Sequence, residues 1–376
     1  MKKVLMLTNV ASMIVQFNMR NIKLFQQSGY KVYVACNFEE GNTCNKEVID
    51  KLKNELNRID VNYYQVDFGR NIQNPSVFIK AYEQTKYIVK QEKFDVIFCQ
   101  STLAGIIGRI LGYKYNCKVI YIVHGFQFYP GASKIRWLTF YTVEKYLSKK
   151  TDCLILTNYD DFTIAKRSFK AHNIFYVQGV GIELEKYKRN EINGKKIRKE
   201  LGFSDDDFVL FSAGELSERK NHRIVMDIIK QLNNSKIKYI ICGIGALEND
   251  YKAFIQKNGL EKQIYLLGYR EDLVDIYSAA NLFIFPSFYE GLPVSLMIAM
   301  ATKTPIVCSK IRGNTDLIDD NLYMFDPHSQ DSIKKTMLNA IECKNLDIVQ
   351  TNYNKVLNFS DKAVDKRMLD IIKNIQ

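Results

Sequence analysis

Residues 285–297 have the sequence FPSFYEGLPVSLM, in which an apolar strand ends at Phe285, a short polar turn follows and a helix begins around Leu292–Pro293. Proline suits the first turn of a helix, where its missing N–H group is not needed. The turn therefore presents free backbone N–H groups and the positive end of a helix dipole, an arrangement suited to a phosphate group. Glu290 comes just before this helix. Its carboxylate either hydrogen-bonds the hydroxyls of a sugar or caps the helix.

The alternation of strand and helix continues along the chain. Helical periodicity marks stretches such as 78–91 and 104–113. Strands that are buried on both faces have continuous apolar runs, and helices form the crossovers between them, so the pattern predicts parallel α/β sheets. The expected strands are 4–7, 31–35, 61–66, 95–99, 118–123 and 153–156 in a first series, and 208–212, 237–242, 264–267, 282–285 and 305–308 in a second.

The chain has 376 residues, more than the roughly 250–300 that a single core usually supports. The charged stretch 186–199 separates the two strand series. We therefore predict a first Rossmann-like domain over residues 1–187 and a second over 188–359, with an amphipathic helix at 360–376 that packs back on the first. Two doubly wound units of this kind would face each other across a cleft, where the carboxyl ends of their strands bind ligands.

The amino-acid composition and the net charge limit the classes of function that this protein can have. Hydrophobic residues make up 47% and charged residues 25%, which is typical of a globular protein and excludes disorder of the whole chain. The net charge of +12 admits nucleic acid, an anionic membrane surface, a phosphorylated small molecule or simply a solvated surface. The basic residues are dispersed and no recognised module occurs, which argues against nucleic-acid binding.

The cysteines and histidines suggest neither disulfides nor a metal site. The eight cysteines form no C-x-x-C pair and the four histidines are scattered, so we expect reduced, buried cysteines in a cytosolic protein. No apolar run reaches the roughly 18 residues that span a bilayer. The start Met1-Lys2-Lys3 resembles a signal peptide, but Thr8 and Asn9 interrupt the apolar run, so we expect an opening strand.

Two further loops follow predicted strands of the second series. In residues 212–222, SAGELSERKNH, the adjacent cations Arg219 and Lys220 suit a diphosphate, since arginine offers bidentate hydrogen bonds and lysine a point charge. A solvated turn is the alternative. Gly243-Ile244-Gly245 allows close approach of the backbone, although the third glycine of a dinucleotide-binding motif is absent because position 248 is glutamate.

The first series contributes two segments. His124 directly follows the strand 118–123, either as a site residue or as a buried structural histidine. Residues 133–150 have the pattern of a basic, aromatic, amphipathic helix of the kind that lies on an anionic membrane surface, or else of an ordinary helix packed in its domain. Its aromatic and basic side chains include Trp137, Lys134, Arg136, Lys149 and Lys150.

Taken in order, these segments resemble glycosyltransferase family 4, which has the GT-B fold, over nearly the whole chain. Residues 311–318, IRGNTDLI, look like the polysaccharide-biosynthesis branch of that family. Glu144 falls where the family's following helix usually carries an acid. The other matching motifs are His124-Gly125-Phe126, the domain-entry segment 180–187, the phosphate loop Gly214-x-Leu216-x-x-x-Lys220, the base-pocket strand 267–272 and Glu290-Gly291-Leu292-Pro293, which opens an E-x(7)-E motif.

The resemblance implies a retaining transfer of a hexosyl or N-acetylhexosaminyl group in capsule or exopolysaccharide synthesis. The donor would be a nucleotide-diphosphate sugar, expected to be a UDP-sugar, bound by residues 188–359. The acceptor would be a lipid-linked glycan bound by residues 1–187 at the cytoplasmic face of a bacterial plasma membrane. No cofactor and no metal are implied, because fixed cations can stabilise the leaving diphosphate.

The resemblance also assigns roles to individual residues. The catalytic candidates are Glu290, His124 and Lys220. The donor-binding candidates are Arg219, Gly214, Gly243, Tyr269, Arg270, Gly291, Leu292, Pro293, Val294 and Ile298. The candidates facing the acceptor and the membrane are Trp137, Lys134, Arg136, Lys149 and Lys150.

Three positions depart from the family pattern. The second glutamate of E-x(7)-E, which in the family holds the ribose hydroxyls, is replaced by Ile298. Glu215 stands where many relatives have arginine, and Met13 where the polysaccharide branch often has histidine. A catalytically weak or inactive partner subunit, and a sugar-nucleotide epimerase on the same fold, are therefore the alternative functions.

Overall fold

The computed structural model describes residues 1–69, 75–343 and 346–375. The chain divides into two compact units. Unit 1 contains Met1–Val180 and Lys362–Gln376, and unit 2 contains Gly181–Asp361. The sequence placed the corresponding boundaries after residues 187 and 359.

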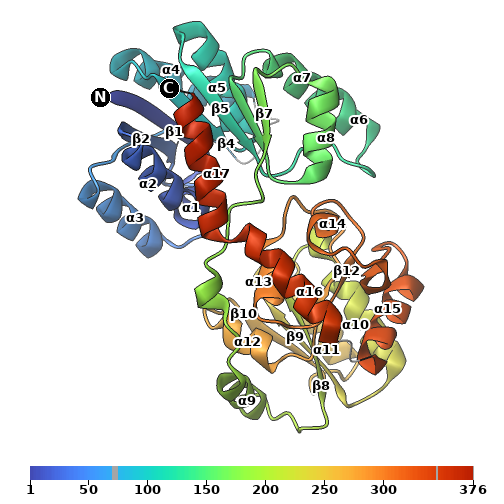
Figure 1. Cartoon of the computed structure of the whole chain (residues 1–376). Helices are drawn as coiled ribbons and strands as arrows, with labels where there is room; N and C mark the ends of the chain where they lie inside the picture. The colour runs from blue at the N-terminus through green and yellow to red at the C-terminus, as the bar shows by residue number, and fades with distance from the viewer. Residues whose placement is uncertain (70–74, 344–345, 376) are drawn as a thin grey trace. The chain divides into compact units, whose positions relative to one another are not determined.

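Within the described residues, unit 1 contains a seven-stranded parallel sheet with the order β3-β2-β1-β4-β5-β6-β7 (Figure 1). Its strands are β1 (Lys2–Val10), β2 (Tyr30–Asn37), β3 (Asn62–Gln65), β4 (Val96–Gln100), β5 (Lys118–Val123), β6 (Cys153–Leu156) and β7 (Asn173–Tyr176). Its helices are α1 (Ala11–Met13), α2 (Met19–Gln27), α3 (Lys46–Arg58), α4 (Pro75–Glu92), α5 (Thr102–Tyr115), α6 (Lys134–Arg136), α7 (Thr142–Ser148) and α8 (Tyr159–Ser168).

The C-terminal helix α17 (Asp361–Asn374) lies beside α1 and α2 in unit 1 (Figure 1). Its buried residues Met368 and Ile371 belong to the same apolar cluster as Ile22 of α2. Arg20 of α2 also forms an ion pair of 2.5 Å with Asp365 of α17. The chain therefore completes the core of unit 1 with its last helix.

Unit 2 contains a six-stranded parallel sheet, among the described residues, with the order β10-β9-β8-β11-β12-β13. Its strands are β8 (Phe208–Ala213), β9 (Ile237–Cys242), β10 (Ile264–Gly268), β11 (Leu282–Phe285), β12 (Ile306–Ser309) and β13 (Met324–Phe325). Helices α9 (Glu191–Glu200), α12 (Leu273–Ala279), α13 (Val294–Ala301) and α16 (Leu346–Val356) contribute to one apolar cluster on the sheet, and α10 (His222–Leu232), α11 (Glu248–Lys257) and α15 (Gln330–Glu342) to the other. The short helix α14 (Asn314–Leu317) follows β12.

The predicted α/β class and parallel sheets are confirmed, and each predicted strand lies within or overlaps an observed one. The sequence missed β7 and β13, which are the outer strands of their sheets. Every residue of β7 is exposed or half-buried, and β13 has two residues. Residues 174–177, IFYV, form a short apolar run that overlaps β7 and was not selected, whereas the two residues of β13 are too few for a run to identify.

The predicted helix over 133–150 is present as a continuous helical stretch, in which a π-helical turn over Trp137–Tyr141 joins α6 directly to α7. One expectation from the sequence needs correction. Not all cysteines are buried, since Cys44 is half-buried and Cys343 is exposed, although all eight are free thiols.

No helix among the described residues has both the length and the apolar character needed to cross a membrane.

Candidate functional site

The candidate site lies at the carboxyl ends of β8 and β11 in unit 2. These strands are parallel neighbours, with Leu282 paired to Leu210 and Phe283 to Phe211. From β8 the sheet continues to β9 and β10 on one side, and β11 begins its other half. The loops after such a pair of strands diverge and leave a ligand site at the switch point. The loops here are residues 214–221 and 286–293.

The two loops are tied together at their bases. The Phe288 backbone N–H donates to the carbonyl of Arg219 at 2.9 Å. Asn221, which has a left-handed backbone (φ +54°), donates from Nδ2 to the carbonyls of Pro286 and Pro327, each at 3.2 Å. Asn221 was not among the predicted site residues. The sequence feature that could have identified it is an asparagine just before a helix, because asparagine adopts the left-handed region more readily than most residues.

Glu290 accepts two charged hydrogen bonds on one oxygen. Arg219 Nη1 is 2.7 Å and Lys220 Nζ 2.8 Å from Glu290 Oε1. The exposed fractions of the side chains are 28% for Arg219, 9% for Lys220 and 10% for Glu290. The structure thus brings together three of the predicted site residues, which come from loops about 70 positions apart in the sequence.

The buried environment of Lys220 disfavours the charged form of its side chain. Burial lowers the pKa of the Lys220 ammonium, and the Glu290 carboxylate acts in the opposite direction. Lys220 Nζ also lies 4.7 Å from the centre of the Phe285 ring. A buried cation that depends on a single carboxylate is suited to bind a further anion.

Glycines allow the loops to pack without side chains between them. A Cβ on Gly214 (φ +154°) would lie 2.9 Å from Lys220 Cε. A Cβ on Gly243 (φ +150°) would lie 1.8 Å from the Gly214 carbonyl oxygen, and one on Gly313 (φ +80°) 2.0 Å from the Gly291 carbonyl oxygen. The backbone contacts at Gly243 and Gly313 leave no room for a Cβ, so only glycine fits at these two positions.

Arg312 is a functional candidate that the residue assignments omitted. Its Nε donates to the Glu290 carbonyl at 3.0 Å, which fixes the backbone of the turn that carries the carboxylate. The sequence analysis had singled out the segment 311–318 but had given Arg312 no role. Its position just after β12 is the sequence feature that could have identified it, because α/β proteins bind ligands beyond the carboxyl ends of their strands.

Buried polar atoms without a hydrogen-bond partner gather around this edge of the sheet. Among the described residues they include Ser217 Oγ, His222 Nδ1, Ser287 Oγ and Asn314 Oδ1, which follow β8, β11 and β12. Such atoms are uncommon in native proteins unless water or a ligand satisfies them. No group of three or more His, Cys, Asp or Glu side chains within the described ranges is arranged to hold a metal ion.

The predicted helix start is displaced by one residue. Pro293 occupies the N-cap of α13, and Val294 is the first helical residue. Gly291 and Leu292 lie in the turn before it. The unpaired N–H groups at the start of α13 therefore begin four residues after Glu290, and such groups suit a phosphate.

The remaining donor-binding candidates of unit 2 have different environments. Ile298 on α13 is 6% exposed and belongs to an apolar cluster. Arg270 forms two hydrogen bonds with Asp272, at 2.7 and 2.6 Å, which raise the pKa of its guanidinium. Tyr269 is 74% exposed, directly after Gly268 (φ +64°) at the end of β10. In the part of the chain that the structure describes, no hydrogen bond or ion pair joins these three residues to Arg219, Lys220 or Glu290, so their roles stay predictions.

His124 lies at the end of β5 in unit 1, within a row of amide side chains. Gln100 Nε2 donates to Asn18 Oδ1 at 2.5 Å, which leaves Gln100 Oε1 to accept from His124 Nε2 at 2.8 Å. This pairing assigns the imidazole proton to Nε2 and leaves Nδ1 able to accept a hydrogen bond. Burial lowers the pKa of His124 to about 4, so the ring is neutral near neutral pH.

The residues predicted to face the acceptor and the membrane divide into two groups. Lys134, Arg136 and Lys149 are exposed and Lys150 is half-buried. Trp137 is half-buried: its ring packs 5.1 Å from that of Phe128, and its Nε1 donates to the Tyr129 carbonyl at 3.2 Å. Its proposed contact with the acceptor or the membrane stays a prediction.

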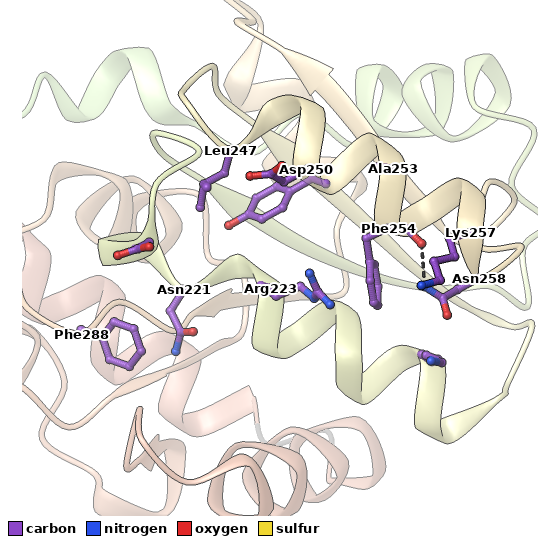
Figure 2. A pocket seen from close by; sticks show the side chains of 12 residues that line it. Asn221, Arg223, Leu247, Asp250, Ala253, Phe254, Lys257, Asn258 and Phe288 are labelled. Carbon is purple, nitrogen blue, oxygen red and sulfur yellow. Dashed lines mark hydrogen bonds between the residues drawn. The ribbon is translucent and has the colours of Figure 1, made fainter.

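A groove of about 750 Å³ lies between α10 and α11 and reaches the two site loops at Asn221 and Phe288 (Figure 2). The guanidinium carbon of Arg223 lies 3.8 Å from the centre of the Phe254 ring, and burial raises the pKa of Tyr251 to about 12. Its charged lining residues are Glu218, Asp250, Arg223, Lys230 and Lys257. Because both signs of charge are mixed along it, this groove indicates no ligand class.

Comparisons with known proteins agree with the fold and identify the family. Residues 193–356 match the family model for glycosyl transferases group 1, and residues 3–158 match the glycosyl transferase 4-like model. A protein of Bacillus subtilis (strain 168) named "Putative glycosyltransferase EpsD" is 28% identical over 332 residues, covering 85% of this chain and 81% of its own.

A second relative is the UDP-Gal:alpha-D-GlcNAc-diphosphoundecaprenol alpha-1,3-galactosyltransferase of Escherichia coli, which is 29% identical over 291 residues, or 74% of this chain and 75% of its own. Among solved structures, Anabaena Alr3699/HepE in complex with UDP superimposes with a TM-score of 0.78 over the full length of both chains at 18% identity. That likeness identifies the GT-B fold. The two family models together span most of both units, and the chain belongs to the group 1, family 4-like glycosyltransferases of the GT-B fold.

Proposed function

We propose that the protein transfers a hexosyl or N-acetylhexosaminyl group from a UDP-sugar to a lipid-linked glycan, with retention of the anomeric configuration, in capsule or exopolysaccharide synthesis. The observation that carries the proposal is the cluster in which Arg219 and Lys220 meet Glu290 beside the start of α13. Two cations and a helix N-terminus are the groups needed to hold a diphosphate.

The two kinds of relative support different parts of this proposal. The HepE structure contains UDP, and a further HepE structure is in complex with UDP-glucose. The Escherichia coli relative is named for a UDP-galactose donor and a diphosphoundecaprenol-linked acceptor. The shared family, together with the cation cluster of this chain, supports the same donor and acceptor classes for this protein.

The proposed mechanism assigns the protein mainly an electrostatic role. Charge develops on the diphosphate as the bond to the sugar breaks, and Lys220, Arg219 and the N–H groups of Val294 and Ser295 stabilise it. The leaving diphosphate oxygen takes the proton of the acceptor hydroxyl, which attacks the same face of the sugar. Glu290 orients the donor sugar, and the fixed cations make a metal ion unnecessary. His124 retains its proposed contact with sugar hydroxyls.

An anionic membrane surface is the proposed location of the acceptor, at the cytoplasmic face of the plasma membrane. Ile135 (74% exposed), Leu138 (73%) and Tyr146 (58%) form an exposed apolar strip along α6, the π turn and α7. Exposed basic residues Lys134 and Arg136 flank it. Apolar side chains flanked by basic ones favour the interface of an anionic bilayer.

A donor screen tests the main proposal. The purified protein is incubated with a panel of nucleotide sugars and a synthetic lipid-diphosphate glycan, and products are identified by mass spectrometry. We expect transfer from a UDP-sugar, with NMR giving the same anomeric configuration in product and donor. An inverted product contradicts retention, and interconversion of the donor without acceptor would favour an epimerase.

The second candidate function is a catalytically weak or inactive partner subunit, and Ile298 is the observation that favours it. An aliphatic side chain cannot hydrogen-bond ribose hydroxyls, and the loss of hydrogen bonds to a charged group costs about 1.5–3 kcal/mol. Isothermal titration with UDP separates the two functions, because a partner subunit without a donor site shows no binding even at millimolar ligand. Ile298→Glu, with Ile298→Leu as control, then tests whether a carboxylate there tightens UDP binding.

A further inference from the structure

The arrangement of charges at the candidate site has a direct consequence for donor binding. The oxygen Glu290 Oε1 receives hydrogen bonds from both Arg219 and Lys220. A carboxylate oxygen and a terminal phosphate oxygen are both anionic acceptors of charge-assisted hydrogen bonds. Glu290 Oε1 therefore occupies the position at which a diphosphate oxygen would receive the same two donors.

The Lys220 ammonium and the Glu290 carboxylate are about equally enclosed, with 9% and 10% of their side chains exposed. The Lys220 stem runs along Gly214, where a Cβ would lie 2.9 Å from Lys220 Cε, and its ammonium lies over the Phe285 ring. The Glu290 backbone is held by Arg312, whose Nε donates to the Glu290 carbonyl at 3.0 Å. An exchange of anions therefore requires the Glu290 side chain to rotate away while Lys220 stays in place.

We propose that Glu290 is an internal competitor of the donor diphosphate, which displaces its carboxylate from Lys220 and Arg219 and so releases it toward the sugar hydroxyls. This inference rests on the proposed function and deepens it at the same site. The exchange keeps the buried ammonium paired at every stage, because one anion replaces another. It also makes the orientation of Glu290 toward the sugar depend on the presence of the diphosphate.

The exchange predicts opposite effects of one substitution on binding and on turnover. Glu290→Gln keeps the shape of the side chain but removes its charge, which weakens its bonds to the two cations. UDP and inorganic pyrophosphate should then bind about tenfold more tightly than to the wild type, equivalent to about 1.4 kcal/mol. Sugar transfer should fall, because the amide is a poorer acceptor for sugar hydroxyls.

Glu215→Gln is the matched control. Glu215 Oε2 lies 4.0 Å from Arg219 Nη2, and the Glu215 side chain is 61% exposed. Glu215→Gln also removes one negative charge close to Arg219, but it leaves the Glu290 carboxylate in place on the two cations. We expect UDP affinity to change by less than about twofold, since exposed ion pairs contribute little. Equal tightening in both variants would assign the effect to net charge and overturn the exchange.

Thermal unfolding gives an independent measurement. Without ligand, Glu290→Gln should unfold at a lower temperature than wild type, because Lys220 loses its charged partner. Pyrophosphate should then raise the unfolding temperature of the variant more than that of the wild type. Glu290→Asp, which retracts the carboxylate by one methylene, should show the same direction if the glutamine variant does not fold.

The outcomes separate the inference from the proposed function. Suppose that pyrophosphate and UDP bind the wild type, and bind Glu290→Gln equally or more weakly. This result overturns the exchange and leaves the transferase proposal intact. Tighter binding to Glu290→Gln, with no sugar transferred by the wild type from any donor, supports the exchange and counts against the transferase. No binding of either ligand to wild type or variant overturns both.

Discussion

Arg109 and Glu144 form a bidentate ion pair in the interior of unit 1, with Nη1 2.7 Å from Oε2 and Nη2 3.1 Å from Oε1. Both side chains are less than 5% exposed, and the guanidinium carbon lies 4.3 Å from the centre of the Tyr121 ring. Arg109 Nε also donates to the Gly105 carbonyl at 2.8 Å. The contacts of Glu144 are thus those of a residue that holds helices and strands of unit 1 together.

Glu144→Gln should therefore reduce stability and leave donor binding unchanged. Removing one partner of a buried pair costs about 3–5 kcal/mol, because the other charge stays buried without compensation. Denaturant unfolding measures the loss, and titration with UDP measures binding. The double variant Arg109→Met/Glu144→Leu removes both charges and should be more stable than Glu144→Gln alone. A folded Glu144→Gln protein that no longer binds UDP would assign Glu144 to the site instead.

Lys220→Met should remove most of the transferase activity. The substitution keeps the length of the side chain but removes the charge proposed to stabilise the leaving diphosphate, which should lower kcat/KM by about 100-fold or more. Lys230→Met, on the exposed face of α10, is the matched control and should retain activity. Unchanged kcat/KM in Lys220→Met would contradict the role of this ammonium.

Gly243→Ala should weaken UDP binding more than its backbone strain alone explains. The new Cβ would lie 1.8 Å from the Gly214 carbonyl oxygen, so the loop that carries Lys220 must move. Overpacking of this kind costs about 1–3 kcal/mol. Gly259→Ala is the control, because Gly259 also has a positive φ (+66°) but its Cβ would meet nothing within 4 Å. Equal UDP affinity in the two variants, measured by titration, would contradict the close packing of these loops.

Stability should fall as the pH decreases below about 6.5 because of two histidines. Burial lowers the pKa of His124 to about 4 and that of His222 to about 3, whereas both have a pKa near 6.5 in the unfolded chain. Between these values the unfolded chain binds protons that the folded chain does not, so the free energy of unfolding decreases as the pH falls.

Denaturant unfolding between about pH 6.5 and 5 measures this slope before most carboxylates titrate. His124→Gln and His222→Gln should each make it shallower. His172→Gln, at an exposed position, is the control. A slope that stays the same in both buried variants would show that other groups cause the acid sensitivity.

The exposed apolar strip should bind anionic vesicles. Cosedimentation with vesicles containing anionic lipid should decrease when Ile135 and Leu138 are replaced by serine, and again when Lys149 and Lys150 are replaced by glutamate. Raising the salt concentration should weaken binding, because exposed charges are screened over about 10 Å at 0.1 M. Replacement of Tyr87, which is 65% exposed on α4, by serine is the control. Unchanged partition in the lysine variant would contradict an electrostatic contribution.

The sequence determined the class of fold and the segments of the site. The apolar runs of β8 and β11 identified buried parallel strands, since such strands have little polar alternation. The Arg219-Lys220 pair and Glu290 were recognisable because each follows a strand, where α/β proteins bind ligands. The two-residue strand β13 is too short for a run to identify, and β7 was missed although residues 174–177 are apolar.

Only the tertiary structure decided which of these groups meet. That Arg219 and Lys220 share one oxygen of Glu290 depends on the pairing of β8 with β11, a contact between residues about 70 positions apart. Likewise, the half-buried Trp137 lies in the π turn, and its ring packs against Phe128. Local sequence fixes backbone preference and the pattern of burial, whereas the partner of a charged or aromatic side chain is set by long-range packing, which no short segment encodes.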